Sequence, residues 1–473
     1  MINSYKNKGF LSKIVLVLFA IVVVALYLYN SFTYHLNVDE REHVYSSYMI
    51  YNGYLPYKDF FEHHHPLLWY TFAPFLKWFK NSPEIWYIIR VYAVVINIGI
   101  LYYIYKIGEF VGINKREAIV ASLLYLTFYA VWVGGKEFRP DSLGLLFFTA
   151  GIYYFFVYVQ KTDFRKLIIS YVLFFLSFMT MQKMSLSLFV MGLIILFLPR
   201  TKRNIKLEIW WLVVPLYGAL GYVGYLYYND ALKDYFELNW ILNLELSIVG
   251  RLYNRLLFIA PILVSLVCLC LFRTGNYYCR AIIILFEVQV IIVLWYAPFI
   301  HYLLPMYPFM AVLLVYCIKK LFASNTIFVL YGLMFALILR GGYLINSYDS
   351  STLSSYVKMS RIELNVTNEN DKIIPGDIWS GGLRKSALGY YWFGWSIALL
   401  DYKLFKRHEF PDLNKIIKEK KPKLIANNDA VMMGCLNDKN EQVLEQCYRL
   451  QLIDKASLED DYRVSDFIYL RKY

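Results

Sequence analysis

Five clusters of ionisable and aromatic residues in this chain border long apolar stretches, and each has the residue types of a reactive site. Asp39 and Glu40 directly follow the first apolar stretch. A carboxylate held near a membrane surface is partly desolvated, which raises its pKa and suits it to take a proton from a hydroxyl group. The alternative is a pair of solvated loop carboxylates. The ionisable residues nearby favour a reactive site.

The second and third clusters are rich in cations. Four charged residues lie within positions 136–141, where Arg139 can bind an anionic phosphate and Asp141 can cap the helix that follows. Gln182 and Lys183 separate two apolar stretches of only about fifteen residues each, so the lysine lies at a short hairpin or enters the bilayer. An ionisable group at membrane depth is costly and indicates a functional role. The alternative for both clusters is a helix cap or turn whose long side chains reach back to water.

The last two clusters contain histidine. His301 and Tyr302 lie at the start of a late apolar stretch and offer hydrogen bonds; the alternative is an aromatic pair at the membrane interface. His63, His64 and His65 are consecutive, a composition that suggests metal. However, consecutive loop residues are expected to point in different directions, and no Glu-x-x-His or His-x-x-x-His spacing accompanies them. The sequence therefore implies no metal or other cofactor, and it leaves substrate hydrogen bonding, a structural role and a divalent ion open.

The composition indicates that the apolar stretches next to these clusters cross a membrane. Of the 473 residues, 59% are hydrophobic and only 18% are charged, which excludes a soluble enzyme, a disordered scaffold and a secreted disulfide-rich protein. The apolar stretches predict about eleven transmembrane helices. They lie near residues 14–32, 85–105, 118–133, 142–159, 167–181, 184–198, 209–228, 253–272, 281–298, 303–318 and 326–344.

The charge pattern predicts the orientation of these helices. The net charge is +13, yet residues 345–473 hold 19 Lys and Arg against 18 Asp and Glu, so the surplus lies in residues 1–344. Within residues 1–344, the loops on one side of the membrane hold 17 basic residues and only four acids. Because Lys and Arg are retained on the cytoplasmic side, we expect a cytoplasmic N-terminus and no nucleic-acid partner. All five clusters then face the outer side.

Two regions follow from the same pattern. Residues 1–344 form a transmembrane region whose first outer loop, 33–84, contains an aromatic run at 67–79 that predicts interfacial helices. Residues 345–473 predict a small α/β domain outside the membrane. Its expected elements are a helix at 412–420 and strands at 423–426 and 466–470. The expected fold is thus an all-α polytopic membrane protein with a small extracytoplasmic α/β domain.

Two of the six cysteines, Cys435 and Cys447, lie in this outer domain. An oxidising compartment would allow them to form a disulfide. The other four lie in or near apolar stretches without zinc-binding spacing and are expected to be small core residues.

The order of the clusters resembles a known family, the polyprenyl-phosphate-sugar-dependent glycosyltransferases of the GT-C superfold. The likeness is to the bacterial relatives of protein mannosyltransferase and of lipid A aminoarabinose transferase, and it extends over essentially the whole chain. The matching pieces are Asp39-Glu40, Gly53-x-x-Pro-Tyr-x-Asp-Phe-Phe with His65-Pro66, Arg139-Pro-Asp141, Gln182-Lys183 and His301-Tyr302-Leu-Leu-Pro. Three adjacent histidines stand where the family commonly shows one or two before proline.

The resemblance implies an inverting transfer of a sugar from undecaprenyl phosphate to a lipid, glycan or protein acceptor at the periplasmic face of the bacterial inner membrane, as in lipid A modification. Asp39 would be the base or would orient the acceptor, with Glu40 as its alternate. Arg139, Lys183 and Lys136 would hold the lipid phosphate. The residues that would line the substrate pocket are Asp141, His63, His64, His65, Tyr57, Asp59, Gln182, His301 and Tyr302.

Two other functions remain as alternatives. A lipid-linked glycan polymerase or ligase would place its large outer loop late in the chain, whereas here the loop with the reactive residues comes first. A transporter or flippase often shows paired repeats and broken helices at mid-membrane. The chain has no internal duplication, and Glu287, which lies within an apolar stretch, has no assigned role.

Overall fold

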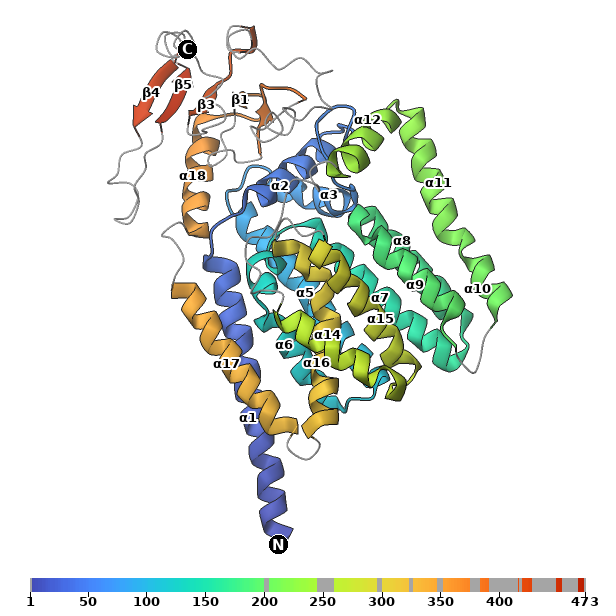
Figure 1. Cartoon of the computed structure of the whole chain (residues 1–473). Helices are drawn as coiled ribbons and strands as arrows, with labels where there is room; N and C mark the ends of the chain where they lie inside the picture. Colours follow the sequence, from blue (N-terminus) through green and yellow to red (C-terminus); the bar gives the residue numbers. More distant parts are fainter. Residues whose placement is uncertain are drawn as a thin grey trace. The chain divides into compact units, whose positions relative to one another are not determined.

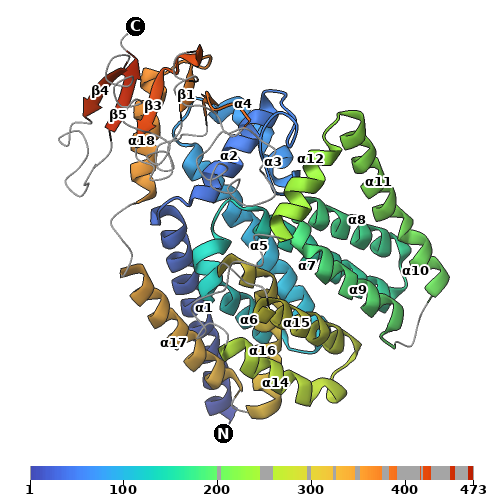
Figure 2. The same cartoon turned by 45° about the horizontal axis from the view of Figure 1, so that its top comes forward.

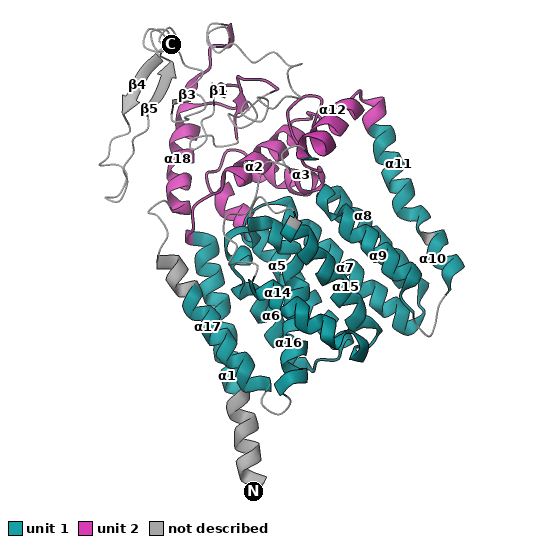
Figure 3. Cartoon of the chain, in the orientation of Figure 1, with its two compact units in different colours: residues 1–32, 91–225, 244–348 teal, residues 33–90, 226–243, 349–473 magenta. Residues whose placement is uncertain are grey.

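The computed structural model describes residues 2–199, 204–244, 259–295, 300–322, 326–346, 352–374, 383–390, 416, 419–427, 448–452 and 467–471. The chain divides into two compact units (Figure 3). Unit 1 comprises residues 1–32, 91–225 and 244–348, and unit 2 comprises residues 33–90, 226–243 and 349–473. Each predicted cluster therefore lies in one unit or the other.

Unit 1 is helical (Figure 1). Its main helices are α1 (Ile2–Thr33), α5 (Ile85–Val111), α6 (Lys115–Thr127), α7 (Pro140–Lys161), α8 (Phe164–Thr180), α9 (Ser185–Phe197), α10 (Ile205–Trp211), α11 (Val213–Tyr228), α14 (Ile259–Leu271), α15 (Tyr277–Trp295), α16 (Tyr307–Phe322) and α17 (Thr326–Asn346). Each expected span overlaps one of these helices. Within the described residues, six helices are long and apolar enough to cross a membrane, and three further apolar helices are shorter.

Small residues allow α7 and α8 to pack closely, side by side in both views (Figures 1 and 2). A Cβ atom at Gly151 would lie 2.5 Å from the Phe174 ring, so a larger residue would push the helices apart. Ser170 donates to the Gly151 carbonyl and Ser177 to the Gly144 carbonyl, both at 2.8 Å. Such small-residue contacts and interhelical hydrogen bonds are what associate helices in a membrane. They fix the start of α7 relative to the end of α8.

Unit 2 combines short helices with a sheet. The helical elements are α2 (Val38–Tyr51), α3 (Leu67–Phe72), the 3-10 turn Ala73–Phe75, α4 (Leu76–Phe79), α12 (Leu232–Phe236), the π-helical Glu237–Leu242 and α18 (Leu353–Val366). The strands are β1 (Lys372–Ile374), β2 (Lys385–Ser386), β3 (Leu424–Asn427), β4 (Tyr448–Leu452) and β5 (Phe467–Arg471). The sheet order is β2-β1-β3-β5-β4, parallel from β2 to β3 and antiparallel from β3 to β4.

The aromatic run at 67–79 is helical as expected, and β3 and β5 overlap the two expected strands. Most of the expected helix at 412–420 lies outside the described residues, as do Cys435 and Cys447.

Local hydrogen bonds fix the start of α2. Asn37 and Glu40 form a capping box, in which the Asn37 side chain accepts from the helix backbone and the Glu40 carboxylate accepts from the Asn37 N–H at 3.0 Å. The same carboxylate forms an ion pair of 2.6 Å with Arg90, and both side chains are fully buried. Arg90 also donates to the His35 carbonyl at 2.8 Å. The segment before α2 and its first turn are therefore held by one network.

Replacing Arg90 with Met removes the cation that neutralises buried Glu40. We expect the free energy of unfolding to fall by about 3–5 kcal/mol, because a buried charge without its partner is strongly destabilising. The measurement is unfolding of the purified protein in detergent. The control is Arg361→Met, which breaks an exposed pair with Glu84 at 3.0 Å and should cost less than about 1 kcal/mol. Equal losses in the two variants would show that the buried pair has no special role.

Candidate functional site

Three of the predicted clusters meet within unit 1. Asp141 lies in the first turn of α7, Lys183 in the 3-10 turn Gln182–Met184, and His301 in the 3-10 helix Ile300–Met306. The Lys183 ammonium contacts Asp141 Oδ1, and Arg139 Nε lies 3.6 Å from Asp141 Oδ2. One carboxylate is therefore shared by two cations. We call Glu137, Arg139, Asp141, Lys183, His301 and Tyr302 the cation cluster.

Further contacts complete the cation cluster. Arg139 Nη2 lies 3.0 Å from His301 Nε2, and Arg139 Nη1 lies 3.5 Å from Glu137 Oε2. The Lys183 ammonium lies 4.0 Å from the centre of the Tyr302 ring, within the range of a cation–π interaction. Arg139 and Asp141 are nearly fully buried, whereas the Lys183 side chain is 25% exposed. Lys183 is thus the most accessible of the three charges.

The structure corrects one expectation here. Asp141 does not cap α7: the N-cap residue is Arg139, Pro140 occupies the first helical position, and Asp141 follows it. Proline is favoured at this position because its missing N–H would lack a partner there in any case. Asp141 instead uses both carboxylate oxygens for the two cations.

Two other predicted residues lie beside the cation cluster in sequence. Lys136 is fully buried, and its ammonium donates to the Trp132 carbonyl at 2.9 Å. Gln182 begins the turn that holds Lys183, and its carbonyl accepts from the Ser185 hydroxyl. Among the described contacts, Lys136 binds a backbone carbonyl, and Gln182 binds the first residue of the helix that follows its turn. Both contacts support the segments that carry Arg139 and Lys183.

Unit 2 holds the predicted carboxylates. Asp39 lies in the first turn of α2 and is partly exposed, and its N–H donates to the Asn37 side chain at 3.2 Å. Glu40 is fully buried against Arg90. The two neighbouring acids thus differ in burial: Asp39 is partly exposed, whereas Glu40 is fully buried in an ion pair.

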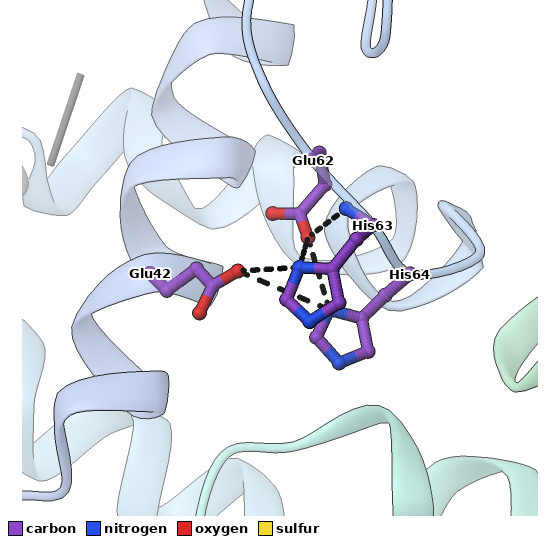
Figure 4. A group of neighbouring side chains, drawn as sticks. All are labelled: Glu42, Glu62, His63 and His64. Atoms are coloured by element: carbon purple, nitrogen blue, oxygen red, sulfur yellow. Dashed lines mark hydrogen bonds and ion pairs between the residues drawn. The ribbon is translucent and has the colours of Figure 1, made fainter. Parts of the chain in front are cut away.

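Next to them, Glu42, Glu62, His63 and His64 form a compact group, which we call the Glu–His cluster (Figure 4). His64 Nδ1 lies 3.0 Å from Glu62 Oε1, and His63 Nδ1 lies 3.5 Å from Glu42 Oε1. The expectation that consecutive histidines diverge is therefore wrong for His63 and His64, because both rings present Nδ1 to the same two carboxylates.

The remaining predicted residues of this loop have structural contacts. His65 is buried, and its Nε2 lies 2.9 Å from the Tyr235 hydroxyl. Burial raises the pKa of Tyr235, so its phenol stays protonated at neutral pH and can donate to His65. Tyr57 is buried at a positive φ of 71° and donates to the His64 carbonyl at 2.7 Å. Asp59 is exposed and accepts from the Leu55 N–H at 2.7 Å. These contacts shape the loop before α3.

Sequence reasoning missed four residues that the structure places in these networks: Glu42, Glu62, Glu137 and Arg90. One of them had a readable signal, because Glu62 directly precedes the histidines. Asn37-x-x-Glu40 is in addition a capping-box pattern that indicates a helix start at residue 38. The pairing of Arg90 with Glu40 spans fifty positions and has no local signal.

Comparisons with known proteins agree with this architecture. Residues 63–227 match the family model of dolichyl-phosphate-mannose-protein mannosyltransferase. ArnT from Cupriavidus metallidurans bound to undecaprenyl phosphate superimposes with a TM-score of 0.62 at 10% identity, covering 96% of this chain and 97% of that chain. Its apo form gives 0.56 at 11% identity, covering 98% of both. No curated protein sequence matches the chain.

An oligosaccharyltransferase from Archaeoglobus fulgidus, tethered with an acceptor peptide, matches with a TM-score of 0.50 at 9% identity, covering 89% of this chain and 69% of that chain. At these identities the likeness concerns the fold. The chain is therefore a multi-pass membrane protein with the GT-C fold of ArnT, as the sequence resemblance implied.

A double-mutant cycle measures the pairing inside the cation cluster. Asp141→Asn removes the carboxylate that Lys183 and Arg139 share, and Lys183→Gln removes one of the two cations of Asp141. Because both changes break the same contact, the double variant should lose less stability than the sum of the two. We expect a coupling of about 1–3 kcal/mol in the free energy of unfolding. The control cycle is Lys106 with Glu109, a pair of 3.3 Å whose side chains are 29% and 31% exposed; it should give less than about 0.5 kcal/mol. Additive losses at Asp141 and Lys183 would contradict the pairing.

Proposed function

We propose that this protein is an inverting glycosyltransferase that transfers a sugar from a polyprenyl phosphate, such as undecaprenyl phosphate, to an acceptor at the outer face of the cytoplasmic membrane. The observation that carries the proposal is the cation cluster, where Arg139 and Lys183 share the Asp141 carboxylate beside an aromatic ring. The fold of ArnT, whose structure is known with undecaprenyl phosphate, supports the same donor.

The cation cluster suits the leaving group of this reaction. When the bond between the sugar carbon and the phosphate oxygen breaks, the lipid phosphate gains one negative charge. Preorganised cations that face this oxygen stabilise the charge as it develops. Arg139 offers a planar fork of donors that matches two phosphate oxygens, and Lys183 offers a point charge. Asp141 holds both cations in place before the lipid phosphate arrives.

The carboxylates of unit 2 suit the acceptor side. In an inverting transfer the acceptor hydroxyl attacks the sugar carbon opposite the leaving phosphate, and a base takes the hydroxyl proton. We assign this step to Asp39, which is partly exposed at the start of α2. Glu40 is a positioning residue in this proposal, because its ion pair with Arg90 fixes the turn that carries Asp39.

The charge distribution supports an outer-face reaction. The excess of Lys and Arg in one set of loops predicts a cytoplasmic N-terminus and a periplasmic C-terminal domain. The lipid-phosphate donor and an acceptor of the cell envelope, whether lipid, glycan or protein, would then meet on that side. The family model matched by residues 63–227 is that of an enzyme that glycosylates protein, whereas the ArnT likeness suggests a lipid acceptor such as lipid A.

Replacing Asp39 with Asn tests the proposed base. We expect sugar transfer in proteoliposomes to slow by about 10²–10⁴-fold, while the binding of undecaprenyl phosphate stays unchanged. The matched control is Glu84→Gln, which neutralises an exposed acid of the same unit. Transfer by correctly inserted Asp39→Asn at the wild-type rate would remove Asp39 from the mechanism.

Replacing Arg139 or Lys183 with Gln tests the donor site. Each change removes a charged hydrogen-bond donor worth about 1.5–3 kcal/mol, so we expect undecaprenyl phosphate to bind about 10–100-fold more weakly. Arg139→Lys should recover only part of the affinity, because an ammonium group lacks the planar, bidentate geometry with which a guanidinium binds two phosphate oxygens. Lys106→Gln, at a 29% exposed lysine, is the control for the loss of one positive charge. Undiminished lipid binding by both cluster variants would refute the assignment.

A further inference from the structure

The side chain of Asn239 is buried without a hydrogen-bond partner. It is 1% exposed and lies in the π-helical turn Glu237–Leu242 of unit 2. Neither its Nδ2 nor its Oδ1 forms a hydrogen bond within the part of the chain that the structure describes. A buried carboxamide without partners has lost the hydrogen bonds that it would make to water, and most buried polar groups in folded proteins are therefore paired. An unpaired amide indicates a place where a ligand or a water molecule binds.

Contacts on both sides of Asn239 hold this turn against the loop before α3. The Tyr235 hydroxyl lies 2.9 Å from His65 Nε2. The Asn243 amide donates to the His63 carbonyl at 2.8 Å and to the Asn239 carbonyl at 3.0 Å. The backbone of Asn239 is therefore fixed beside this loop. π-Helical turns are rare and occur frequently at functional sites.

Aromatic rings gather in the same part of unit 2. The His65 ring stacks on Tyr235 with centres 5.6 Å apart, and Trp240 meets His65 edge-on at 6.1 Å. The Tyr57 ring meets Tyr235 edge-on at 5.4 Å. Asn239 follows Tyr235 by four residues, so the two lie on the same side of the helical segment. Small-molecule sites commonly combine aromatic walls with a few placed polar groups such as an asparagine amide, and this region has that composition.

The two open groups of Asn239 define the chemistry of the ligand. Nδ2 is a hydrogen-bond donor and Oδ1 is an acceptor. An anion can accept from Nδ2 but offers no donor to Oδ1, whereas a metal ion can bind Oδ1 but offers no acceptor to Nδ2. A hydroxyl group both donates and accepts. Adjacent hydroxyls of a sugar ring can therefore satisfy both ends of the amide at once, while the C–H groups of the ring contact aromatic side chains.

We propose that Asn239 binds a pair of hydroxyl groups of a sugar, carried either by the donor lipid or by the acceptor. The inference rests on the proposed glycosyltransferase function and names a residue that recognises the sugar. Side chains around the buried amide must move to admit the ring, as is common on binding. A site built to bond a hydroxyl rejects ligands without it, because its polar groups would then stay unpaired. Asn239 thus favours a lipid that carries a sugar over the bare lipid.

Replacing Asn239 with Leu, which has the same shape without the polar atoms, gives a readout that does not depend on activity. Because the change removes an unpaired buried amide, we expect the thermal unfolding midpoint of the ligand-free, full-length protein in detergent to stay unchanged or to rise. A midpoint lowered by Asn239→Leu would overturn the proposal, since it would assign the amide a structural role.

The matched control is Asn97→Leu. Asn97 is also 1% exposed, but its amide donates to the Gly135 carbonyl at 2.6 Å and accepts from the Tyr125 hydroxyl at 3.2 Å. This variant should lower the unfolding midpoint, because it removes the partner of a buried hydroxyl and a donor to a buried carbonyl.

Binding is measured on wild-type protein and on Asn239→Leu. The ligands are undecaprenyl phosphate, bare or linked to glucose, mannose or aminoarabinose, and the free methyl glycosides of these sugars as mimics of an acceptor. We expect at least one sugar to strengthen wild-type binding, and Asn239→Leu to bind that ligand about 10–100-fold more weakly while its affinity for the bare lipid stays unchanged. A loss with the lipid-linked sugars assigns Asn239 to the donor, and a loss with the methyl glycosides assigns it to the acceptor.

Three results would contradict this expectation in different ways. A sugar-dependent gain that Asn239→Leu retains would overturn the inference and leave the proposed function standing. Wild-type protein that binds the bare lipid but gains nothing from any of the sugars would have the same meaning. Wild-type protein that binds no lipid phosphate would refute the proposed function, and this inference with it.

Discussion

The buried ion pair between Glu40 and Arg90 is the contact on which the carboxylates of unit 2 depend. The two side chains are fully removed from water, so each charge is tolerable only because the other lies 2.6 Å away. The pair also fixes where α2 begins, since Glu40 completes the capping box with Asn37. Asp39 and Glu42 are three positions apart on this helix and therefore lie on neighbouring parts of its surface. One ion pair thus orients both the proposed base and Glu42 of the Glu–His cluster.

In unit 1, two cations share one carboxylate. Close packing of α7 and α8 through small residues brings Asp141 to the turn that holds Lys183. Asp141 and Glu137 together then offset the charges of Lys183 and Arg139, which would otherwise repel each other in a place with little solvent. A phosphate that binds there would compete with Asp141 for the two cations. In the proposed reaction, the cluster would hold the dianionic leaving group and then release it, because the carboxylate can take its place.

The sequence predicted the membrane class, the helical fold and the segments that carry charge, because apolar length and charge placement are local properties. Because the charge pattern places all five clusters on the outer side, the sequence also predicted that they form one site, and the structure brings those around Arg139, Lys183 and His301 together within unit 1. It could not predict which atoms pair. Asp141 was expected as a helix cap but binds two cations, because Pro140 and Arg139 already form the helix start. The convergence of His63 and His64 on Glu42 depends on the loop conformation and on its packing against α2, which residue types alone do not encode.

The most direct test of the account is an experimental structure of the full chain in a lipid environment with undecaprenyl phosphate bound. The account predicts that the lipid phosphate contacts the Arg139 guanidinium and the Lys183 ammonium. A phosphate bound away from both cations, or Asp39 on the opposite side of the membrane from them, would contradict the assignment of this protein as a lipid-phosphate-dependent glycosyltransferase.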